Sequence, residues 1–461
     1  MSRPFNRRGL VVALVGAALA ASLLAAGGSA ARSAAAAPTL VIDNSFTIKT
    51  SDPGRAFDPT ASIVDRAIYD TLFTYNGGNL AVPVPLLVST WTESKNAESF
   101  TFNLKKNVHF ADGTNAAKAD TAEQWLNSSA SAGAGSGPYT LSAYSTTSQI
   151  TLVPSTNYWG APKASFSSVV VRNMVAATQL LNVARGSHEI AIDLSADQAA
   201  TLKGNSNVSV TLQPSTWIFF LYTNNNPKIS TVTSNKSYQQ AIRYALNYAS
   251  LVALAGKGAI QAPGLIPSMF LGALPQSAAV NTSLAKAKAA LAASGGGSQS
   301  VTLQYPSDLT INGVPFTSLA EKIQSNLQAA GFKITLSGSP TSNWLDVYRS
   351  GKMALGLSLW GPDYPDPADY LVFAPGNLVG LRAGWPAGSN VAIEGVANRA
   401  LVTTNTAARK AIYQHFQRLL NAGGPFFPLI QPTQVFVATK DLKGAVYNAE
   451  YDTNITQISP A

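Results

Sequence analysis

The sequence predicts an α/β protein with at least two lobes, and three observations lead to this prediction. Strand-like alternation of apolar and polar residues dominates the early part of the chain, whereas helical spacing appears from Tyr238 onward. A strand–helix–strand unit is expected at residues 301–336, and such a unit implies a parallel strand pair. A chain of 461 residues is also expected to divide into lobes with separate hydrophobic cores.

The first segment, residues 1–37, has the order of a secretory signal peptide. Arg3, Arg7 and Arg8 precede an apolar run of about 17 residues, and small residues follow. We therefore expect a cleaved leader rather than an N-terminal membrane anchor. The Arg7-Arg8 pair leaves twin-arginine export open beside the general secretory route.

Composition and charge exclude several classes of protein. Hydrophobic residues make up 46% of the chain and charged residues 12%, which is a globular rather than a disordered composition. Removing the four arginines of the leader lowers the net charge from +9 to +5. No Lys/Arg cluster with interleaved aromatic residues occurs, so nucleic acid is not an expected partner. The absence of cysteine excludes disulfides and thiol catalysis.

The expected strands come first along the chain. Strand-like segments are predicted at residues 40–46, 100–110, 139–153 and 217–222. The third of these is expected as two strands joined near Ser145 to Ser148. The fourth is a continuous apolar run, WIFFLY, which is typical of a strand buried on both faces.

Helices are predicted at residues 238–253, 283–293 and 317–330. Ser283 is the N-cap candidate of the second helix, and Gly331 stands at the C′ position of the third. Strands at Val301–Tyr305 and Phe332–Leu336 flank the third helix, which implies a parallel pair with a right-handed crossover. The glycine-rich residues 294–298 lack the spacing of a nucleotide-binding loop.

The candidate site follows one of the buried strands. Apolar residues alternate with small ones from Leu355 to Trp360, and Pro362 and Pro365 then prevent a strand ladder from continuing. Asp363 and Tyr364 stand between these prolines. A carboxylate just past the C-terminal end of a buried strand lies where α/β sheets place their ligands. The alternative interpretation is a turn in which the aspartate has only a local role.

The W-x-x-D-Y-P-D-P run that contains Asp363 resembles a hallmark of the substrate-binding proteins of peptide-type (oligopeptide, dipeptide, nickel) ABC importers, the solute-binding family 5. Other segments resemble the same family in the same order, so the resemblance spans most of the chain after the leader. These segments are Phe57-Asp58-Pro59 with residues 68–73, residues 100–113, residues 135–139 with 157–160, and residues 240–252.

The resemblance implies a two-lobed α/β periplasmic-binding-protein fold (type II, peptide-binding cluster) with a small domain inserted early. The expected division is a signal peptide at 1–37, lobe I at 38–57 with 136–222 and 432–461, a reduced inserted domain at 58–135, and lobe II at 223–431. Relatives run on for many tens of residues before the GPY segment, whereas Thr114 to Ser136 is only 23 residues. We therefore expect the inserted domain to be shortened.

The resemblance also implies a set of ligand-binding residues. Peptide-binding relatives use the aspartate at the position of Asp363 to pair the α-ammonium group of the ligand. The backbone near Trp360 and Gly361 would add strand-like hydrogen bonds to an extended ligand, and Tyr364 would pack beside it. Trp385 is a further candidate for the pocket wall.

Trp217 and Trp344 are further candidates for the wall, with core packing as the alternative for them and for Trp385. The strand before Trp360 lacks the arginine that some relatives use for a ligand carboxylate. Arg382 and Arg349 are candidates to replace it.

The implied function is capture of a small extracellular solute, above all a peptide, by lobe closure and its delivery to a membrane ABC permease. No catalysis, cofactor or metal is expected, and the protein is expected to be a monomer. Without cysteine it lacks a lipid anchor, so a periplasmic or extracellular location is expected.

Two alternatives remain open. One is a secreted sensor or adhesin-like binding protein that has lost transport, and the other is a secreted hydrolase that uses Asp363, Asp366 and Asp369. His188-Glu189 resembles the start of a zinc motif, but Ile192 stands where the second histidine would be.

Overall fold

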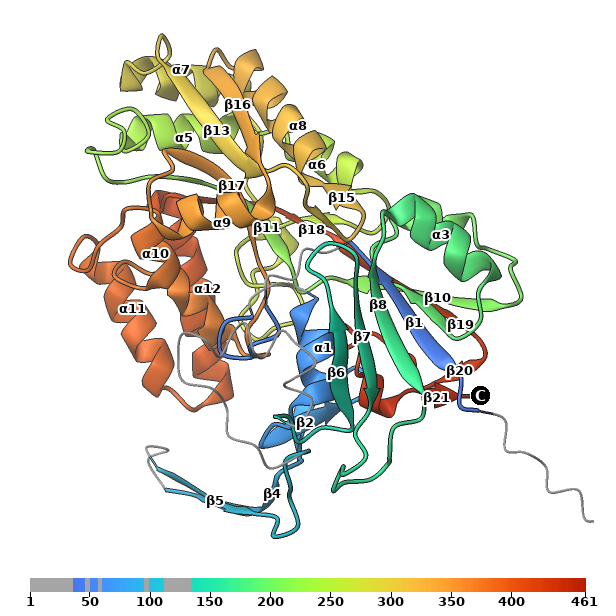
Figure 1. Ribbon diagram of the computed structural model, residues 1–461. Coiled ribbons are helices and arrows are strands. Elements are labelled where there is room, and N and C mark those ends of the chain that lie inside the picture. Colours follow the sequence, from blue (N-terminus) through green and yellow to red (C-terminus); the bar gives the residue numbers. More distant parts are fainter. Residues whose placement is uncertain (1–35, 46–49, 57–59, 95–98, 112–133) are drawn as a thin grey trace, which may run out of the picture. The chain divides into compact units, whose positions relative to one another are not determined.

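Two large mixed β-sheets organise the chain (Figure 1). The structure is a computed structural model that describes residues 36–45, 50–56, 60–94, 99–111 and 134–461. Residues 1–35 of the expected leader, the Phe57-Asp58-Pro59 segment and residues 114–133 of the short stretch before the GPY segment lie outside these residues. In the part of the chain that the structure describes, no helix is both long and apolar enough to cross a membrane.

The first sheet has seven strands. In spatial order they are β10 (Val208–Pro214), β19 (Thr433–Thr439), β9 (Glu189–Ala191), β1 (Thr39–Asn44), β8 (Ser168–Asn173), β7 (Gln149–Pro154) and β6 (Tyr139–Tyr144). Strand β1 is parallel to both of its neighbours. Its residues Leu40 and Ile42 are fully buried against α1 (Ala61–Ile68), so the predicted opening strand is confirmed. Strands β6 and β7 form the predicted pair.

A second, smaller core belongs to the same sheet. It contains residues of α3 (Ala176–Arg185) and α4 (Ala196–Ala200) together with Val435 and Val437 of β19. Because strands present alternate side chains to opposite faces, Phe436 of the same strand joins the first core instead. The seven-stranded sheet is therefore packed on both faces.

The second sheet has six strands. In spatial order they are β12 (Ile260–Gln261), β18 (Phe426–Gln431), β11 (Ile218–Thr223), β17 (Leu355–Trp360), β13 (Ser300–Pro306) and β16 (Lys333–Ser339). Every residue of β11 is buried, and alternate residues enter two different cores, Phe219 in one and Phe220 in the other. This confirms the predicted strand with two buried faces.

The pairing of β11 corrects one expected boundary. This strand pairs with β17 and β18, so it belongs to the six-stranded sheet. The expected end of lobe I after Tyr222 would have placed it with the seven-stranded sheet. The division between the sheets falls before Ile218 instead, because a fully apolar strand is best buried at the centre of the larger core.

The helices on one face of this sheet follow the sequence prediction with one exception. Strands β13 and β16 are parallel and joined through α8 (Phe316–Ala329), and α7 (Leu284–Ser294) begins after Ser283, as expected. The expected helix at 238–253 is instead two helices, α5 (Lys236–Ala245) and α6 (Tyr248–Ala255). The side chain of Asn247 caps α6 by accepting a hydrogen bond from the Ser250 N–H, and this cap starts a new helix.

The other face of the six-stranded sheet is covered by a run of helical segments after β16. These are α9 (Thr341–Arg349), the 3₁₀ helix η3 (Pro367–Phe373), α10 (Leu378–Arg382), α11 (Val391–Val402) and α12 (Thr406–Gly423). Trp344, Tyr370 and Phe416 are buried in the core between these helices and the sheet. This packing fixes the direction in which α9 and α10 present their remaining side chains.

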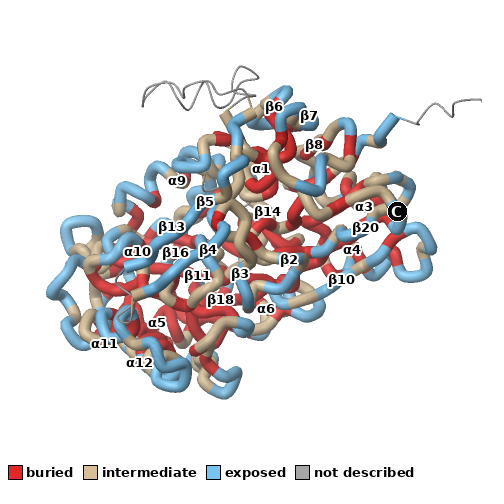
Figure 2. The backbone as a smooth tube through the Cα atoms, turned by 90° about the horizontal axis from the view of Figure 1, so that it is seen from below, coloured by how far each residue is buried: buried red, intermediate tan, exposed pale blue. Residues whose placement is uncertain are grey.

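Short hairpins complete the described fold. They are β2 (Phe73–Asn76) with β3 (Asn79–Pro85), β4 (Val88–Glu93) with β5 (Phe100–Leu104), β14 (Thr310–Ile311) with β15 (Val314–Pro315), and β20 (Leu442–Lys443) with β21 (Ser459–Pro460); two single 3₁₀ turns are η2 (Gln276–Ala278) and η4 (Ile455–Gln457). The β4–β5 hairpin is exposed at nearly every residue (Figure 2). The predicted strand at 100–110 ends at Leu104, which pairs with Val88, the first residue of β4.

Two short connections join the sheets within residues 134–461, one at residues 215–217 and the other at Pro432. The Ser215 N–H donates to the Pro432 carbonyl at 3.1 Å, and the Gln431 amide donates to the Ser215 carbonyl at 2.7 Å. The two connections therefore lie side by side. Adjacent short connections of this kind can act as a hinge.

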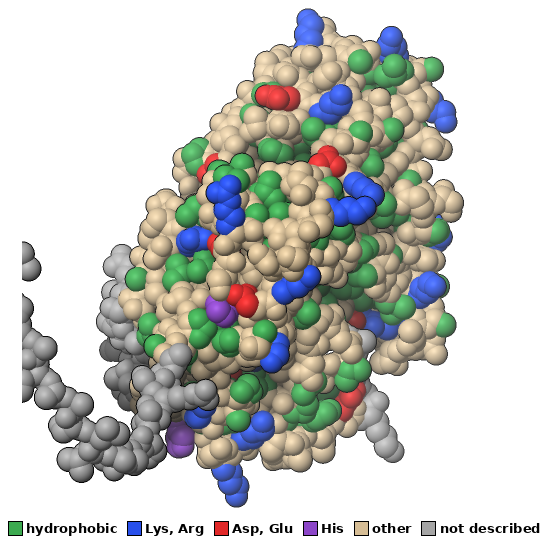
Figure 3. Space-filling view, turned by 90° about the vertical axis from the view of Figure 1, so that its right-hand side faces the viewer, with side chains coloured by type: hydrophobic (Ala, Val, Ile, Leu, Met, Phe, Trp, Pro, Cys, Tyr) green, Lys and Arg blue, Asp and Glu red, His purple; other side chains and the backbone are tan. Residues whose placement is uncertain are grey.

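Charged side chains are sparse on the surface. On the face drawn in Figure 3, Lys and Arg side chains stand apart from one another among uncharged and hydrophobic residues, and few acidic side chains are visible. This agrees with a chain in which only 12% of residues are charged.

Candidate ligand-binding site

A cavity of about 720 Å³ is lined by segments of both sheet-containing halves of the molecule. One side is formed by residues between Pro53 and Thr71 and by residues 449–452, and the other by α9, α10 and the end of β17. Its wall combines aromatic rings with ionisable side chains. The ionisable side chains include Asp65, Arg66, Arg349, Asp363, Arg382, Glu450 and Asp452.

The end of β17 delivers the predicted motif to this cavity. Trp360 is the last residue of the strand, and Gly361 follows in close contact with the ring of Trp217. A Cβ atom at Gly361 would lie 2.6 Å from that ring, so only glycine fits without a shift of the ring. Trp217, Trp360, Gly361 and Asp363 all line the cavity.

The three aspartates of the motif have different roles. Asp366 accepts hydrogen bonds from the Ala368 N–H at 2.8 Å and from Arg409 at 2.7 Å, so it caps η3 and anchors α12. Asp369 accepts from the Trp360 indole N–H at 2.7 Å and fixes that ring. The carboxylate of Asp363 makes no such bond to any residue that the structure describes, and it is exposed at the cavity wall.

An aromatic stack holds Arg382, the cation whose charge acts on Asp363. The Arg382 guanidinium lies 4.8 Å from the centre of the Tyr348 ring, and that ring stacks on Trp344 at 4.9 Å with an interplanar angle of 12°. Partial burial raises the pKa of Asp363, and the positive charge of Arg382 acts in the opposite direction. The cavity therefore contains a carboxylate and a guanidinium that interact electrostatically without forming an ion pair.

Glu450 adds a second carboxyl group to the wall. Burial raises the pKa of Glu450 to about 8, and the negative charges of Asp363 and Asp369 contribute to the shift. Burial likewise raises the pKa of Asp369 to about 6. At neutral pH the Glu450 carboxyl is thus largely protonated, and a cation placed beside it would favour its ionised form.

The end of β17 also leaves backbone groups for a ligand. Strand β13 pairs with β17 only at Leu355 and Gly356. Ser358, Leu359 and Trp360 line the cavity beyond that point. An extended ligand can therefore continue the sheet along this edge by main-chain hydrogen bonds.

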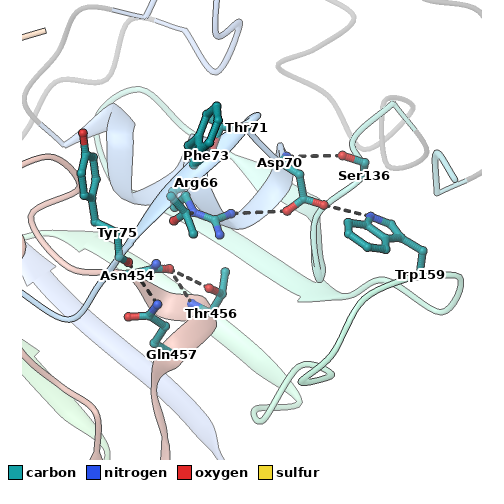
Figure 4. Close-up of polar contacts among 11 residues, drawn as sticks. Arg66, Asp70, Thr71, Phe73, Tyr75, Ser136, Trp159, Asn454, Thr456 and Gln457 are labelled. Carbon is teal, nitrogen blue, oxygen red and sulfur yellow. Dashed lines mark hydrogen bonds and ion pairs between the residues drawn. The ribbon is translucent and has the colours of Figure 1, made fainter. Parts of the chain in front are cut away.

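A fully paired cluster lies behind Arg66, which lines the opposite wall (Figure 4). Asp70 accepts hydrogen bonds from Arg66 at 3.4 Å and from the Trp159 indole at 3.0 Å, and its own N–H donates to Ser136 at 3.3 Å. Arg66 also donates to Thr74 at 3.3 Å. Three of the segments quoted for the family resemblance, at 68–73, 135–139 and 157–160, thus meet at Asp70.

Two of the expected site residues lie elsewhere. The side chain of Tyr364 is 46% exposed and is not part of the cavity lining. Trp385 is 3% exposed and packs near Phe426 in the core, so it is a core residue rather than a wall residue. Arg382 and Arg349, the expected substitutes for a strand arginine, both line the cavity, as does Trp344.

Sequence reasoning missed Glu450, Tyr348 and Arg66 as wall residues. Glu450 lies far along the chain from the motif and belongs to no local pattern, so no signal in the sequence indicated it. Arg66 had a weak signal, since it stands four residues before Asp70 of the family-like segment 68–73.

The described residues contain no group of three His, Cys, Asp or Glu side chains that could hold a metal ion. His188 contacts Asp441, with 3.6 Å between Nδ1 and Oδ2, and Glu189 forms an ion pair with Arg172. Asp366 and Asp369 are committed to Arg409 and Trp360, which argues against their use as a catalytic acid pair.

Comparison with known proteins gives a family match. Residues 116–377 match the model of the middle region of the bacterial extracellular solute-binding proteins, family 5. The chain is 28% identical over 319 residues to the Probable D,D-dipeptide-binding periplasmic protein of Escherichia coli (strain K12). That alignment covers 68% of this chain, and the chain spans only 60% of the length of that relative.

Solved structures give the same fold. The murein tripeptide binding protein of Escherichia coli superposes with a TM-score of 0.75 at 18% identity, covering 92% of this chain and 98% of its own. A dipeptide binding protein from Pseudoalteromonas sp. SM9913 in complex with Met-Leu gives 0.76 at 15% identity, with 92% and 100% covered. The expected two-lobed α/β fold is therefore confirmed, whereas the shortened insert stays a prediction.

Proposed function

This chain belongs to family 5 of the bacterial extracellular solute-binding proteins, and from that membership we propose that it captures a short peptide and delivers it to an ABC permease in the membrane. Members of this family bind solutes outside the cytoplasm. We propose the finer points on the same basis: export by a cleaved leader, function as a monomer, and the absence of any catalysed reaction.

The uncommitted carboxylate of Asp363 carries the proposal of a peptide. Asp366 and Asp369 have partners within the fold, whereas Asp363 lies at the cavity wall without one among the described residues. A ligand ammonium group would supply the missing partner by a charge-assisted hydrogen bond. The backbone of Ser358 to Gly361 would bind the extended main chain of the ligand.

Arg382 sets the length of the ligand. It is held on the Tyr348 ring, its charge partly opposes the rise in the pKa of Asp363 that burial causes, and it has no carboxylate within ion-pair distance among the described residues. A peptide that places its ammonium at Asp363 and its terminal carboxylate at Arg382 must be short. We therefore favour di- and tripeptides with free ends, one side chain of which would rest against the half-buried ring of Trp217.

Capture would proceed by closure of the two halves about the adjacent connections at residues 215–217 and at Pro432. The ligand would touch Asp363 and Arg382 from one half and residues 449–452 from the other. Only ligand contacts that are stronger in the closed state than in the open state drive closure, so the ligand must contact both halves.

The test is calorimetric titration of the exported protein with di-, tri- and pentapeptides, each with a free or an acetylated N-terminus. We expect short free peptides to bind, and both acetylation and Asp363→Asn to weaken binding about 10- to 100-fold. Glu321→Gln, on the exposed face of α8, is the matched control. If acetylated peptides bind the native protein as well as free ones, the ammonium contact is wrong.

A further inference from the structure

A second pocket, of about 880 Å³, shares no lining residue with the Asp363 cavity. It is formed by one face each of α5 and α12, by Lys286 of α7 and by the segment before α7, and α5 and α7 are neighbours in Figure 1. Gln240, Arg243 and Tyr244 come from α5, and Arg418 and Asn421 from α12. These spacings of three and four residues show that each helix turns a continuous stripe toward the pocket.

The lining of this pocket is cationic. Arg243, Lys286 and Arg418 line it, and no aspartate or glutamate does. Among the described residues none of the three cations has a carboxylate within ion-pair distance. The Lys286 ammonium lies 5.3 Å from the centre of the Tyr244 ring, which holds it over the pocket.

Arg243 is the unusual member, because its side chain is almost fully buried without a counter-ion. It is 3% exposed and donates to the carbonyls of Phe426 at 3.3 Å and Gly424 at 3.1 Å. Its Nε–H is buried and has no acceptor. A buried guanidinium without an anion retains a desolvation cost that neutral carbonyl acceptors only partly offset.

A fourth cation strengthens the positive potential. The Lys236 ammonium is held by three neutral acceptors, Asn225 Oδ1, Gln239 Oε1 and the Gly423 carbonyl. Burial and the charge of Arg243 both lower the pKa of Lys236. Four cations thus share one region of helices without an acidic partner from the described residues.

We propose that this pocket binds the phosphate group of a multivalent oxyanion. Lys286 and Arg418 are exposed and supply charged donors at the rim, while Arg243 supplies fixed positive charge at the base. A phosphate with two charges accepts several charge-assisted hydrogen bonds at once, which suits a rim of separate cations. The group belongs either to a free phosphate ligand or to the headgroup of an anionic lipid.

The experiment uses the full exported protein and the double variant Lys286→Gln, Arg418→Gln. Inorganic phosphate and pyrophosphate are titrated by calorimetry at 0.15 M NaCl, and phosphatidylglycerol vesicles are tested by co-sedimentation. The matched control is Lys288→Gln, Arg399→Gln, which removes one exposed lysine from the same helix and one exposed arginine from α11.

We expect saturable binding of pyrophosphate or of the vesicles, weakened about tenfold for each rim cation removed and unchanged in the control. Binding of pyrophosphate assigns a free ligand, and binding of vesicles alone assigns a lipid headgroup. The proposal is overturned if none of inorganic phosphate, pyrophosphate and the vesicles binds saturably, or if the control variant loses as much affinity as the rim variant. Peptide affinity is unaffected by either variant, because the two pockets are separate.

Discussion

Arg66 and Arg382 line opposite walls of the same cavity, and each has an aspartate nearby, Asp70 behind the lining and Asp363 within it. On one wall Arg66 and Asp70 form a buried ion pair, and Asp70 also binds Trp159 and Ser136 (Figure 4). On the other wall Arg382 and Asp363 influence each other but do not pair.

The difference separates structural charges from charges that await a ligand. In a buried pair desolvation offsets much of the attraction, and burial raises the pKa of Asp70 despite the charge of Arg66, but removing one partner leaves a costly uncompensated charge. An exposed ion without a partner contributes little to stability, and it is available to bind a ligand of opposite charge. The following predictions test this separation.

The largest effect is expected at the paired wall. Asp70→Asn should lower the free energy of unfolding by about 3–5 kcal/mol, because it leaves the buried Arg66 guanidinium without its counter-ion. Urea-induced unfolding at pH 7 measures this change. Asp363→Asn is the counterpart and should alter the free energy of unfolding by less than about 1 kcal/mol. Equal destabilisation by the two variants would show that Asp70 and Asp363 do not differ in their contribution to stability.

A pH-dependent effect of intermediate size is expected at Glu450. Its pKa is raised to about 8 from an ordinary value of 4.5, so the folded state holds this proton more tightly than the unfolded chain does. The associated stability is complete below about pH 4.5 and is lost as the pH rises through about 8.

Glu450→Gln removes this titration. Relative to the native protein, the variant should therefore gain stability between pH 5 and pH 9, by about 1–3 kcal/mol. Unfolding curves at the two pH values, with Glu321→Gln as the control, measure the gain. A difference between Glu450→Gln and native protein that stays constant with pH would show that Glu450 is not buried as an acid.

A smaller and more selective effect is expected at Arg382. Arg382→Gln should weaken the binding of a short peptide with a free carboxylate about tenfold, because a charge-assisted hydrogen bond is lost. A C-terminally amidated peptide should be affected much less by the same substitution. Calorimetry with both peptides, and with Arg399→Gln as the control, separates the two cases. Equal losses for both peptides would assign Arg382 a purely structural role on the Tyr348 ring.

The smallest effect is expected at Tyr364, which stands next to Asp363 in the chain but outside the cavity lining. Tyr364→Ala should leave peptide affinity within about twofold of the native value, because nearly half of this side chain is in solvent. The same titration measures it. A tenfold loss would extend the binding surface to the tip of the loop.

The sequence predicted those features that depend on local pattern. The apolar run at 217–222, the strand–helix–strand unit around α8 and the cap at Ser283 follow from spacing and side-chain chemistry, and the structure confirms each of them. The motif at Trp360 to Asp363 was predicted as a strand end that delivers a carboxylate to a ligand, and the structure places it on a cavity.

Features that depend on tertiary contacts were not predictable in this way. Glu450 lies near the C-terminal end of the sequence but lines the cavity, and no local pattern links it to Asp363. Trp385 is of a residue type that often lines ligand pockets, but its ring packs beside Phe426 in the core. The break at Leu246 depends on a single capping side chain, Asn247, within an otherwise continuous helical pattern.

The position of β19 has a consequence for how the chain reaches its native state. This strand, at residues 433–439, lies between β10 and β9, whereas the six-stranded sheet is made from residues 218–431 without interruption. During synthesis or export the later half of the molecule can therefore assemble as a contiguous unit, while the half that emerges first waits for its missing strand. The seven-stranded sheet closes only when nearly the whole polypeptide has emerged, so a chain truncated before residue 433 would keep an open edge between β9 and β10.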